Sequence, residues 1–188
     1  MAKGLDAGPG LQLRPIRLRD ARALFALVEA NRAWLRRWLP WLDEHQRPDQ
    51  TRTFIDRIRE LERRGITFTC GLWWQGELVG MVGFNWIDRT NRTGHVGYWI
   101  AEPHGGRGLV TRAVEALLRY GFTERGLHRV EIRAAVRNRA SRRVAERLGF
   151  RHEGTLRQAE WLYGRPVDHA LYGKLATDAA LPKGGPRT

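Results

Sequence analysis

A glycine-rich loop between a strand-like segment and an amphipathic helix constrains this sequence more than any other feature. Gly105, Gly106 and Gly108 stand within four positions, directly before a helix expected over 108–124. The apolar stripe of that helix consists of Val110, Val114, Leu117, Leu118 and Phe122. The first N–H groups of a helix lack internal partners, the helix dipole is positive at that end, and glycine lets a ligand approach the backbone closely. The loop therefore predicts a site for a pyrophosphate.

Two well-known phosphate-binding patterns do not match this loop. It lacks the Gly-Lys-Ser/Thr ending of a nucleoside-triphosphate loop and the Gly-x-Gly-x-x-Gly of a dinucleotide site. A sharp turn without any ligand is the alternative that the loop alone leaves open. The neighbouring sequence is needed to distinguish a pyrophosphate site from a turn without a ligand.

Hydrophobic periodicity divides the chain into a helical beginning and a sheet-rich remainder. After a first strand, three helices are expected. One follows Asp20, one contains three tryptophans, and one follows Asp49, and both aspartates are expected to be N-caps. From Ile66 the period falls to two, with a hairpin about Gln75-Gly76. Strands are expected at 11–18, 66–74, 77–87, 94–101, 129–136, 150–157 and 166–175, and a further helix at 139–148. This order predicts an α/β (α+β) architecture in which helices cover a mixed sheet.

The length of the chain fits one domain. Its 188 residues support a single sizeable core. We place the domain at 10–176, with loose ends at 1–9 and 177–188 that are rich in Gly, Pro and Ala. The longest apolar run, Ala23 to Val28, is too short for a membrane span or a signal peptide. Cys70 is the only cysteine, which excludes an internal disulfide and favours a buried structural thiol and a cytoplasmic location.

The chain is strongly basic, with a net charge of +13, and all but three of its 33 basic residues are arginines. Such a surface attracts anions, whether phosphates, nucleic acid or an acidic protein. The arginines are spread along the chain rather than gathered in a tail. The sequence therefore favours a solvated basic surface over a nucleic-acid interface, and it leaves open an arginine bias of genomic or thermal origin.

A second motif lies about thirty residues beyond the glycine loop. Residues 138–150 read Asn-Arg-Ala-Ser-Arg-Arg-Val-Ala-Glu-Arg-Leu-Gly-Phe. Asn138 can cap a short helix, Ser141 falls in its first turn, and Gly149 ends it. A plain helix cap explains Asn138 without any ligand, and this role is compatible with binding.

Together the two motifs make the chain resemble the GNAT superfamily of N-acetyltransferases. That family carries Gln/Arg-x-x-Gly-x-Gly/Ala between a strand and a helix, and residues 105–110 occupy the same place here. Gly108 matches the central glycine, whereas Gly105 and Val110 depart from the pattern. The missing long side chain at position 105 removes one phosphate contact, and the backbone donors from 106 to 111 remain. The Asn-x-x-Ser start and Gly-Phe end of 138–150 match the second family motif.

Within the superfamily the chain resembles the RimL-type subgroup, the ribosomal-protein-serine N-acetyltransferases, over about residues 11–175. The shared residues are Leu13-Arg14-Pro15 with Asp20, Trp38-Leu39-Pro40-Trp41, Gly97-Tyr98-Trp99-Ile100, Leu127-His128-Arg129, and Leu156-Arg157-Gln158-Ala159-Glu160 with Asp168-His169 and Tyr172. The resemblance implies the GNAT fold, a mixed, mostly antiparallel central sheet of about seven strands flanked by helices. It also implies an acetyl-CoA-dependent N-acetyltransferase (an acyltransferase) with acetyl-CoA (coenzyme A) as cosubstrate.

The resemblance also assigns roles to residues. It implies that Glu160, expected between the last two strands, is the general base, and that Ser141 protonates the coenzyme A thiolate or donates a hydrogen bond to it. The expected cofactor-binding residues are Ile100, Ala101, Gly105, Gly106, Arg107, Gly108, Leu109, Val110, Thr111, Asn138 and Ser141, with Ile100 and Ala101 acting through their main chain. Without the resemblance, Glu160 reads as an exposed loop carboxylate and Ser141 as a plain helix residue.

Tryptophan is frequent, with eight residues in the chain. Trp34, Trp38 and Trp41 recur at spacings of four and three and share one helical face. These residues and Trp161 either pack against the sheet or line the groove of the acceptor substrate, and the sequence leaves both open. The six histidines show no metal-ligand spacing, so no metal site is expected.

The chemistry of acetyl transfer favours a weakly basic amine as acceptor. An α-amine has a pKa of about 8 and a lysine of about 10.4, so deprotonating the lysine at neutral pH costs roughly 3 kcal/mol more. The expected function is acetylation of a protein N-terminal α-amine, and the subgroup suggests an acidic ribosomal protein as partner. The alternatives are acetylation of a small-molecule amine, such as an aminoacyl nucleotide or a polyamine, and a non-catalytic coenzyme A- or RNA-binding module. No membrane partner is expected, and both a monomer and a homodimer are left open.

Overall fold

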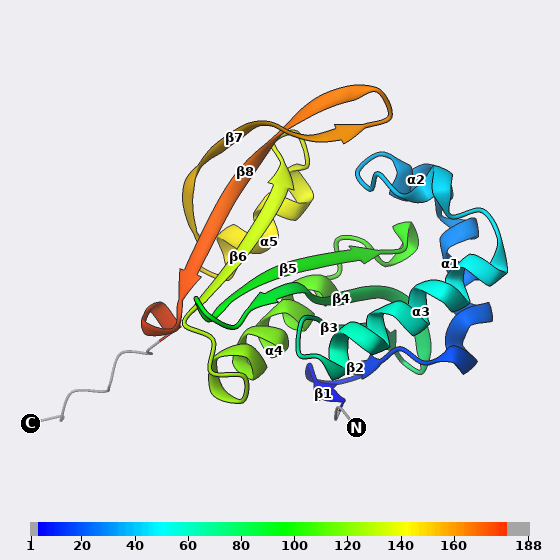
Figure 1. Ribbon diagram of the computed structural model, residues 1–188, viewed down its shortest axis with the longest axis horizontal. Coiled ribbons are helices and arrows are strands. Elements are labelled where there is room, and N and C mark those ends of the chain that lie inside the picture. Colours follow the sequence, from blue (N-terminus) through cyan, green and yellow to red (C-terminus); the bar gives the residue numbers. More distant parts are fainter. Residues whose placement is uncertain (1–3, 180–188) are drawn as a thin grey trace, which may run out of the picture.

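A single mixed sheet organises the computed structural model, which describes residues 4–179 (Figure 1). The strands follow the order β1-β2-β3-β4-β5-β6-β8-β7. Their bounds are β1 Leu5–Asp6, β2 Leu11–Pro15, β3 Phe68–Trp74, β4 Glu77–Asp88, β5 Thr93–Ile100, β6 Arg129–Ala135, β7 Arg151–Leu162 and β8 Arg165–Leu175. Among these described strands, β5 and β6 form the one parallel pair, and every other neighbouring pair is antiparallel. The predicted architecture is confirmed, with eight strands in place of about seven.

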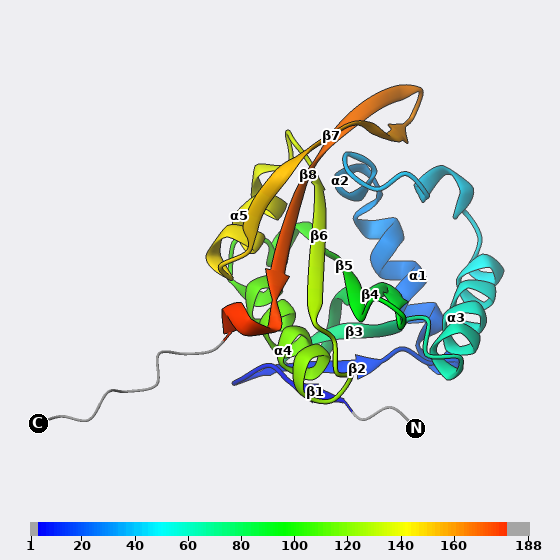
Figure 2. The same ribbon diagram turned by 60° about the vertical axis from the view of Figure 1, so that its left-hand side comes forward.

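Helices cover both faces of the sheet (Figure 2). Their bounds are α1 Ala21–Ala30, α2 Arg32–Arg36, α3 Pro48–Arg63, α4 Leu109–Thr123 and α5 Arg139–Arg147, and the 3-10 turns are η1 Leu18–Asp20, η2 Leu42–Glu44, η3 Glu102–His104 and η4 Ala176–Ala179. Helices α1 and α3 lie on one side of the sheet, and α4 and α5 lie on the other. Each side has its own apolar core, centred on Ile55 and Met81 or on Leu117 and Val130. No helix in the described part of the chain is long and apolar enough to cross a membrane.

Local sequence explains most of the element boundaries. Gln75 and Gly76 both have positive φ, at 50° and 88°, which the two-residue hairpin between β3 and β4 requires, and the predicted hairpin is confirmed. Asp20 occupies the expected N-cap position of α1, but its side chain makes no capping hydrogen bond to that helix, and the expected cap at Asp49 is wrong. The Asp20 carboxylate accepts the Arg17 N–H at 2.9 Å and closes η1. Helix α3 begins at Pro48, before Asp49, because proline fits the first helical position without losing a needed N–H.

The N-terminal segment expected to be loose at 1–9 is partly ordered. Leu5 and Asp6 form β1, which pairs with Leu13 and Gln12 of β2. The Arg112 guanidinium fixes the following turn by donating to the carbonyls of Ala7 and Pro9. Contacts between residues so far apart in the sequence cannot be predicted from local composition.

The remaining part of that end, residues 1–3, lies outside the described residues, as do residues 180–188 of the expected C-terminal tail at 177–188. The first residues of that tail belong to η4, where the Asp178 carboxylate accepts the Leu175 N–H at 3.0 Å.

Candidate active site

The parallel pair of strands opens into a cleft. Residues 93–96 of β5 pair with residues 129–132 of β6, and the strands then diverge, as Figure 1 shows. The space between them continues into a cleft of about 1770 Å³, bounded by α1–α3 on one wall and by the starts of α4 and α5 on the other. This exceeds the roughly 300–1,000 Å³ of an ordinary small-molecule pocket. The cleft therefore has room for two substrates side by side.

The diverging end of β5 presents a main-chain edge to this cleft. The Ala101 N–H donates to the Val79 carbonyl of β4 at 2.8 Å. Because main-chain groups along a strand point alternately to either side, those of Tyr98 and Ile100 face the cleft. An extended ligand with amide groups can pair with such an edge. The structure supports this role for Ile100, whereas Ala101 is 2% exposed and does not line the cleft.

The glycine loop and the start of α4 present free main-chain donors at the cleft wall. Among the described residues, no main-chain N–H from Gly106 to Thr111 has a hydrogen-bond partner, whereas the Gly105 N–H is bonded to the Glu102 carbonyl at 3.0 Å. Gly106 and Gly108 both have φ of 75°, and a Cβ on either would meet nothing within 4 Å. The loop is therefore open toward the cleft, with its donors and the positive end of the helix dipole exposed to a ligand.

Most of the residues expected to bind the cofactor line this cleft together. They are Ile100, Gly105, Gly106, Gly108, Leu109, Val110, Thr111, Asn138 and Ser141. Arg107 is exposed and does not line it.

The start of α5 holds Ser141 at the cleft. The Asn138 side chain accepts the Ser141 N–H at 3.1 Å, so Asn138 is the helix cap expected from sequence. The Tyr98 hydroxyl lies 3.0 Å from Ser141 Oγ and also 3.0 Å from the Ser141 carbonyl. Burial raises the pKa of Tyr98 to about 12. Tyr98 was not among the expected site residues, although a lone phenol between the apolar Val96 and Ile100 on one strand face was an available signal.

Glu160 reaches the cleft from a bulged strand rather than from a loop. It belongs to β7 and pairs with Val167 of β8, so its expected place between the last two strands is wrong. The register shifts between Leu156 and Glu160, where Gln158 has a φ of 49° and donates its N–H to the Asp168 carboxylate at 2.8 Å. Such a bulge re-aims the following side chain.

The Glu160 carboxylate has a histidine partner inside the cleft. His169 of β8 lies with Nε2 3.3 Å from Glu160 Oε2, and both residues line the cleft. The Glu160 side chain is 27% exposed, so it is accessible to water without being an open surface carboxylate. His169 was not among the expected site residues. Its position opposite Glu160 depends on the β7–β8 register, which the sequence does not reveal.

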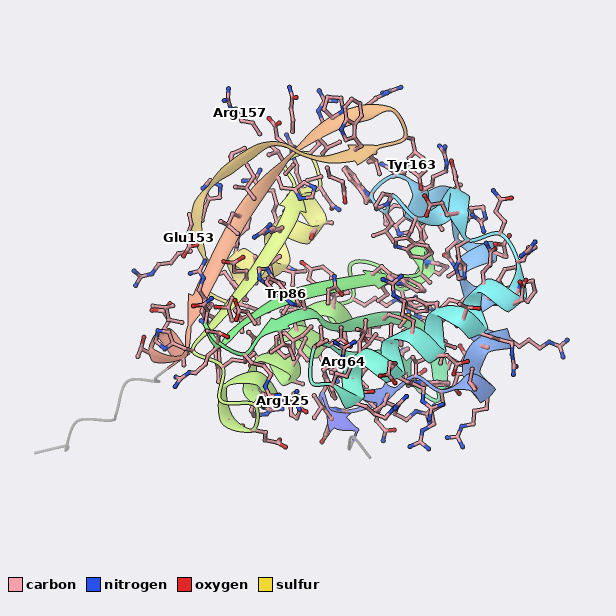
Figure 3. The ribbon with its side chains drawn as sticks, in the orientation of Figure 1. Arg64, Trp86, Arg125, Glu153, Arg157 and Tyr163 are labelled. Atoms are coloured by element: carbon pink, nitrogen blue, oxygen red, sulfur yellow. The ribbon has the colours of Figure 1, made fainter. Side chains whose placement is uncertain are left out.

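The tryptophans divide between the cleft and the surface. Trp34, Trp38 and Trp41 all line the cleft, and Trp34 and Trp41 also pack against the core under α1 and α3, so the two roles left open by the sequence coexist. Trp161 is 68% exposed and does not line the cleft. Its neighbour Tyr163, at the hairpin tip beside α2 in Figure 3, donates to the Leu39 carbonyl at 2.6 Å. This contact joins the β7–β8 hairpin to the segment that follows α2.

Two other reactive side chains, His95 and Cys70, have structural surroundings that explain them. His95 Nδ1 lies 3.2 Å from the Glu131 carboxylate, which Arg129 and Arg133 also contact. Burial lowers the pKa of His95, which stacks on the half-exposed Trp86 labelled in Figure 3. Burial also raises the pKa of the Cys70 thiol, so Cys70 is a structural residue rather than an acyl carrier.

Comparisons with known proteins identify the family of this chain. The model of the acetyltransferase (GNAT) domain family matches residues 11–151. The ribosomal-protein-serine acetyltransferase of Escherichia coli (strain K12) is 31% identical over 175 residues, which cover 93% of this chain and 98% of the relative. A solved RimL ribosomal L7/L12 alpha-N-protein acetyltransferase in complex with coenzyme A has a TM-score of 0.91 at 30% identity and covers 94% and 99% of the two chains.

A second solved neighbour contains two bound ligands. The microcin C7 self-immunity acetyltransferase MccE, in complex with acetyl-CoA and AMP, has a TM-score of 0.88 at 27% identity, with 93% and 97% of the two chains covered. The fold, the cosubstrate and the enzyme class implied by the two sequence motifs are thereby confirmed. This chain belongs to the GNAT family and is an acetyl-CoA-dependent N-acetyltransferase.

Proposed function

We propose that this enzyme acetylates the N-terminal α-amine of a protein, most plainly a ribosomal protein, in the cytoplasm. One observation carries the proposal: a single cleft combines an anion-binding helix start, an open strand edge and the Glu160 carboxylate. The relatives named for ribosomal-protein acetylation support this class of acceptor.

The cofactor half of the cleft lies between β5 and the starts of α4 and α5. The main-chain N–H groups from Gly106 to Thr111 bind the diphosphate, and the main chain of Ile100 pairs with the amide-containing arm. The thioester of acetyl-CoA supplies an activated acetyl group there. Ser141 donates a hydrogen bond to the sulfur as it becomes a thiolate.

The acceptor half lies between α1–α3 and the β7–β8 hairpin. The amine attacks in its neutral form, and Glu160 takes, through a water molecule, the proton that the nitrogen loses as the amide bond forms. His169 orients the Glu160 carboxylate through their contact at 3.3 Å. An α-amine suits this mild base better than a lysine, because its pKa is about two units lower.

Cationic side chains on the acceptor wall favour an acidic protein segment. Arg37 and Arg57 both line the cleft and are exposed, and neither forms an ion pair within residues 4–179. Together with the net charge of +13, they attract a chain with carboxylates near its N-terminus.

A nucleotide-linked amine is the second candidate acceptor. Trp34, Trp38 and Trp41 give the cleft an aromatic wall on which a base can stack, and the Arg37 guanidinium lies 5.2 Å from the Trp34 ring. The neighbour solved with AMP also favours this class. A polyamine is disfavoured because it would meet like charges.

The test is a coenzyme A release assay with mass-spectrometric analysis of the acceptor. The panel contains an acidic peptide with a free N-terminal serine and one internal lysine, the same peptide with a blocked N-terminus, and a non-hydrolysable aminoacyl adenylate. We expect acetylation of the free peptide at its N-terminus and no acetylation of the blocked peptide. Acetylation of the lysine, or of the adenylate alone, would overturn the proposed acceptor. Salt-sensitive RNA binding without turnover on any amine would favour a non-catalytic module.

A further inference from the structure

One contact inside the cleft is not used by the mechanism described so far. The Tyr98 hydroxyl, from β5, lies 3.0 Å from Ser141 Oγ and 3.0 Å from the Ser141 carbonyl at the start of α5. The two residues are 43 positions apart in the sequence. The contact therefore spans the point where β5 and α5 approach each other across the cofactor half of the cleft.

Tyr98 is suited to be a permanent hydrogen-bond donor. Its ring packs against the core under α4 and α5, and burial raises the pKa of its hydroxyl to about 12. The phenol therefore keeps its proton throughout the neutral and mildly alkaline range. Because the backbone of Ser141 is fixed by the Asn138 cap, the phenol and the serine have little freedom to separate.

Ser141 has one hydroxyl hydrogen and two lone pairs, so its direction of donation depends on its neighbours. Within the described residues, Tyr98 is the one hydrogen-bond partner of Ser141 Oγ. When the single Tyr98 hydrogen is shared between the Ser141 carbonyl and Oγ, which both lie 3.0 Å from the phenol oxygen, the serine hydrogen is left for another acceptor. The cleft, which Ser141 lines, is where such an acceptor can bind.

We propose that Tyr98 is a positioning residue that makes Ser141 a hydrogen-bond donor toward the departing sulfur. This inference rests on the proposed role of Ser141 in acetyl transfer. As the acceptor nitrogen bonds to the acetyl carbon, the carbon–sulfur bond breaks and its electron pair stays on sulfur. The Ser141 O–H stabilises that charge and keeps its proton, the nitrogen loses a proton through water to Glu160, and the thiolate later takes a proton from solvent.

The test is a double-mutant cycle on kcat with Tyr98→Phe, Ser141→Ala and the double variant. Phenylalanine keeps the ring and removes the donor, so we expect about a tenfold loss of kcat with an unchanged calorimetric Kd for acetyl-CoA. In the Ser141→Ala background, the same change should alter kcat less than about twofold, because the group it orients is gone. Additive losses, or full kcat in Tyr98→Phe, would overturn the inference.

Tyr172→Phe is the matched control. The Tyr172 hydroxyl also contacts α5, where it accepts from Arg142 and donates to Glu146, each at 2.9 Å, without touching Ser141. This variant should lose thermal stability while kcat is retained. If Ser141→Ala itself keeps full kcat, the role of Ser141 in the proposed function fails; if only Tyr98→Phe keeps it, the failure is confined to Tyr98.

A fluorinated tyrosine at position 98 provides a second readout that does not depend on the folding of Tyr98→Phe. Fluorine lowers the pKa of the phenol and leaves its shape almost unchanged. We expect kcat of this variant to fall as pH rises through the lowered pKa, because a phenolate cannot donate, while the native enzyme keeps its kcat over the same range. Coincident pH profiles would overturn the inference.

Discussion

The carboxylate of Glu160 is the group on which proton removal depends in the proposed mechanism. Glu160→Gln keeps the size and the contact with His169 but cannot take a proton. We expect kcat to fall on the order of 10²-fold or more, which is the usual contribution of a positioned general base, with an unchanged Kd for acetyl-CoA. The measurement is steady-state kinetics with the N-terminal serine peptide, beside calorimetry with acetyl-CoA. Retained kcat at every pH would remove Glu160 from the mechanism.

Gly108 is important for the proposed anion site because of its backbone conformation and its position at the start of α4. It caps α4 with a φ of 75°, and Gly108→Glu adds both left-handed strain of about 1–3 kcal/mol and a negative charge beside the diphosphate. We expect calorimetry to show no acetyl-CoA binding. Gly126→Glu is the matched control, since Gly126 also has a positive φ of 63° with nothing within 4 Å of a Cβ and does not line the cleft. Equal loss of binding in both variants would assign the effect to folding.

At the scale of elements, the bulge in β7 determines where Glu160 points. Asp168→Ala removes the acceptor of the Gln158 N–H, and water replaces it at this exposed position, so stability should change by only about 1 kcal/mol. We expect kcat to fall about tenfold, because a catalytic group displaced by about 1 Å can lose up to 10²-fold, while KM for acetyl-CoA is retained. Asp168→Asn keeps an acceptor oxygen and should restore kcat. A failure of asparagine to restore kcat would contradict a purely positional role.

The elements that could be predicted from the sequence are those with a local cause. The stripe of α4, the loop before it and the Asn138 cap depend on residues within a few positions, and all three are present. The type of turn at Gln75-Gly76 follows from two residues. The periodicity of the strands indicated their existence, although not the order in which they pair.

What the sequence did not reveal depends on contacts between distant residues. The turn after β1 is held by Arg112 from more than 100 positions away, and the contact of Tyr163 with Leu39 spans 124 positions. The approach of Tyr98 to Ser141 and the aim of Glu160 likewise depend on how β5, β7 and α5 meet. The sequence predicted the members of the site better than their geometry.

At the scale of the whole molecule, the cleft separates two kinds of recognition. In the proposed function, the cofactor is bound by main-chain groups of the glycine loop and β5, which tolerate side-chain change, whereas the acceptor is bound by tryptophan and arginine side chains, which do not. The hairpin tip at Tyr163 bridges to Leu39 and bounds the acceptor half. Acceptor choice should therefore vary more readily among GNAT enzymes of this shape than cofactor choice.

The basic surface should affect the rate at which the acceptor binds. With a net charge of +13 and exposed Arg37 and Arg57 in the cleft, an acidic peptide should be steered toward the site. At saturating acetyl-CoA, kcat/KM for that peptide should fall at least about tenfold between low and physiological ionic strength, where the Debye length is about 8 Å. The value of kcat should stay constant, because steering acts before the chemical step. The same peptide with its carboxylates replaced by amides is the control, and an equal salt dependence for both peptides would show that the charge of the chain plays no part in choosing the acceptor.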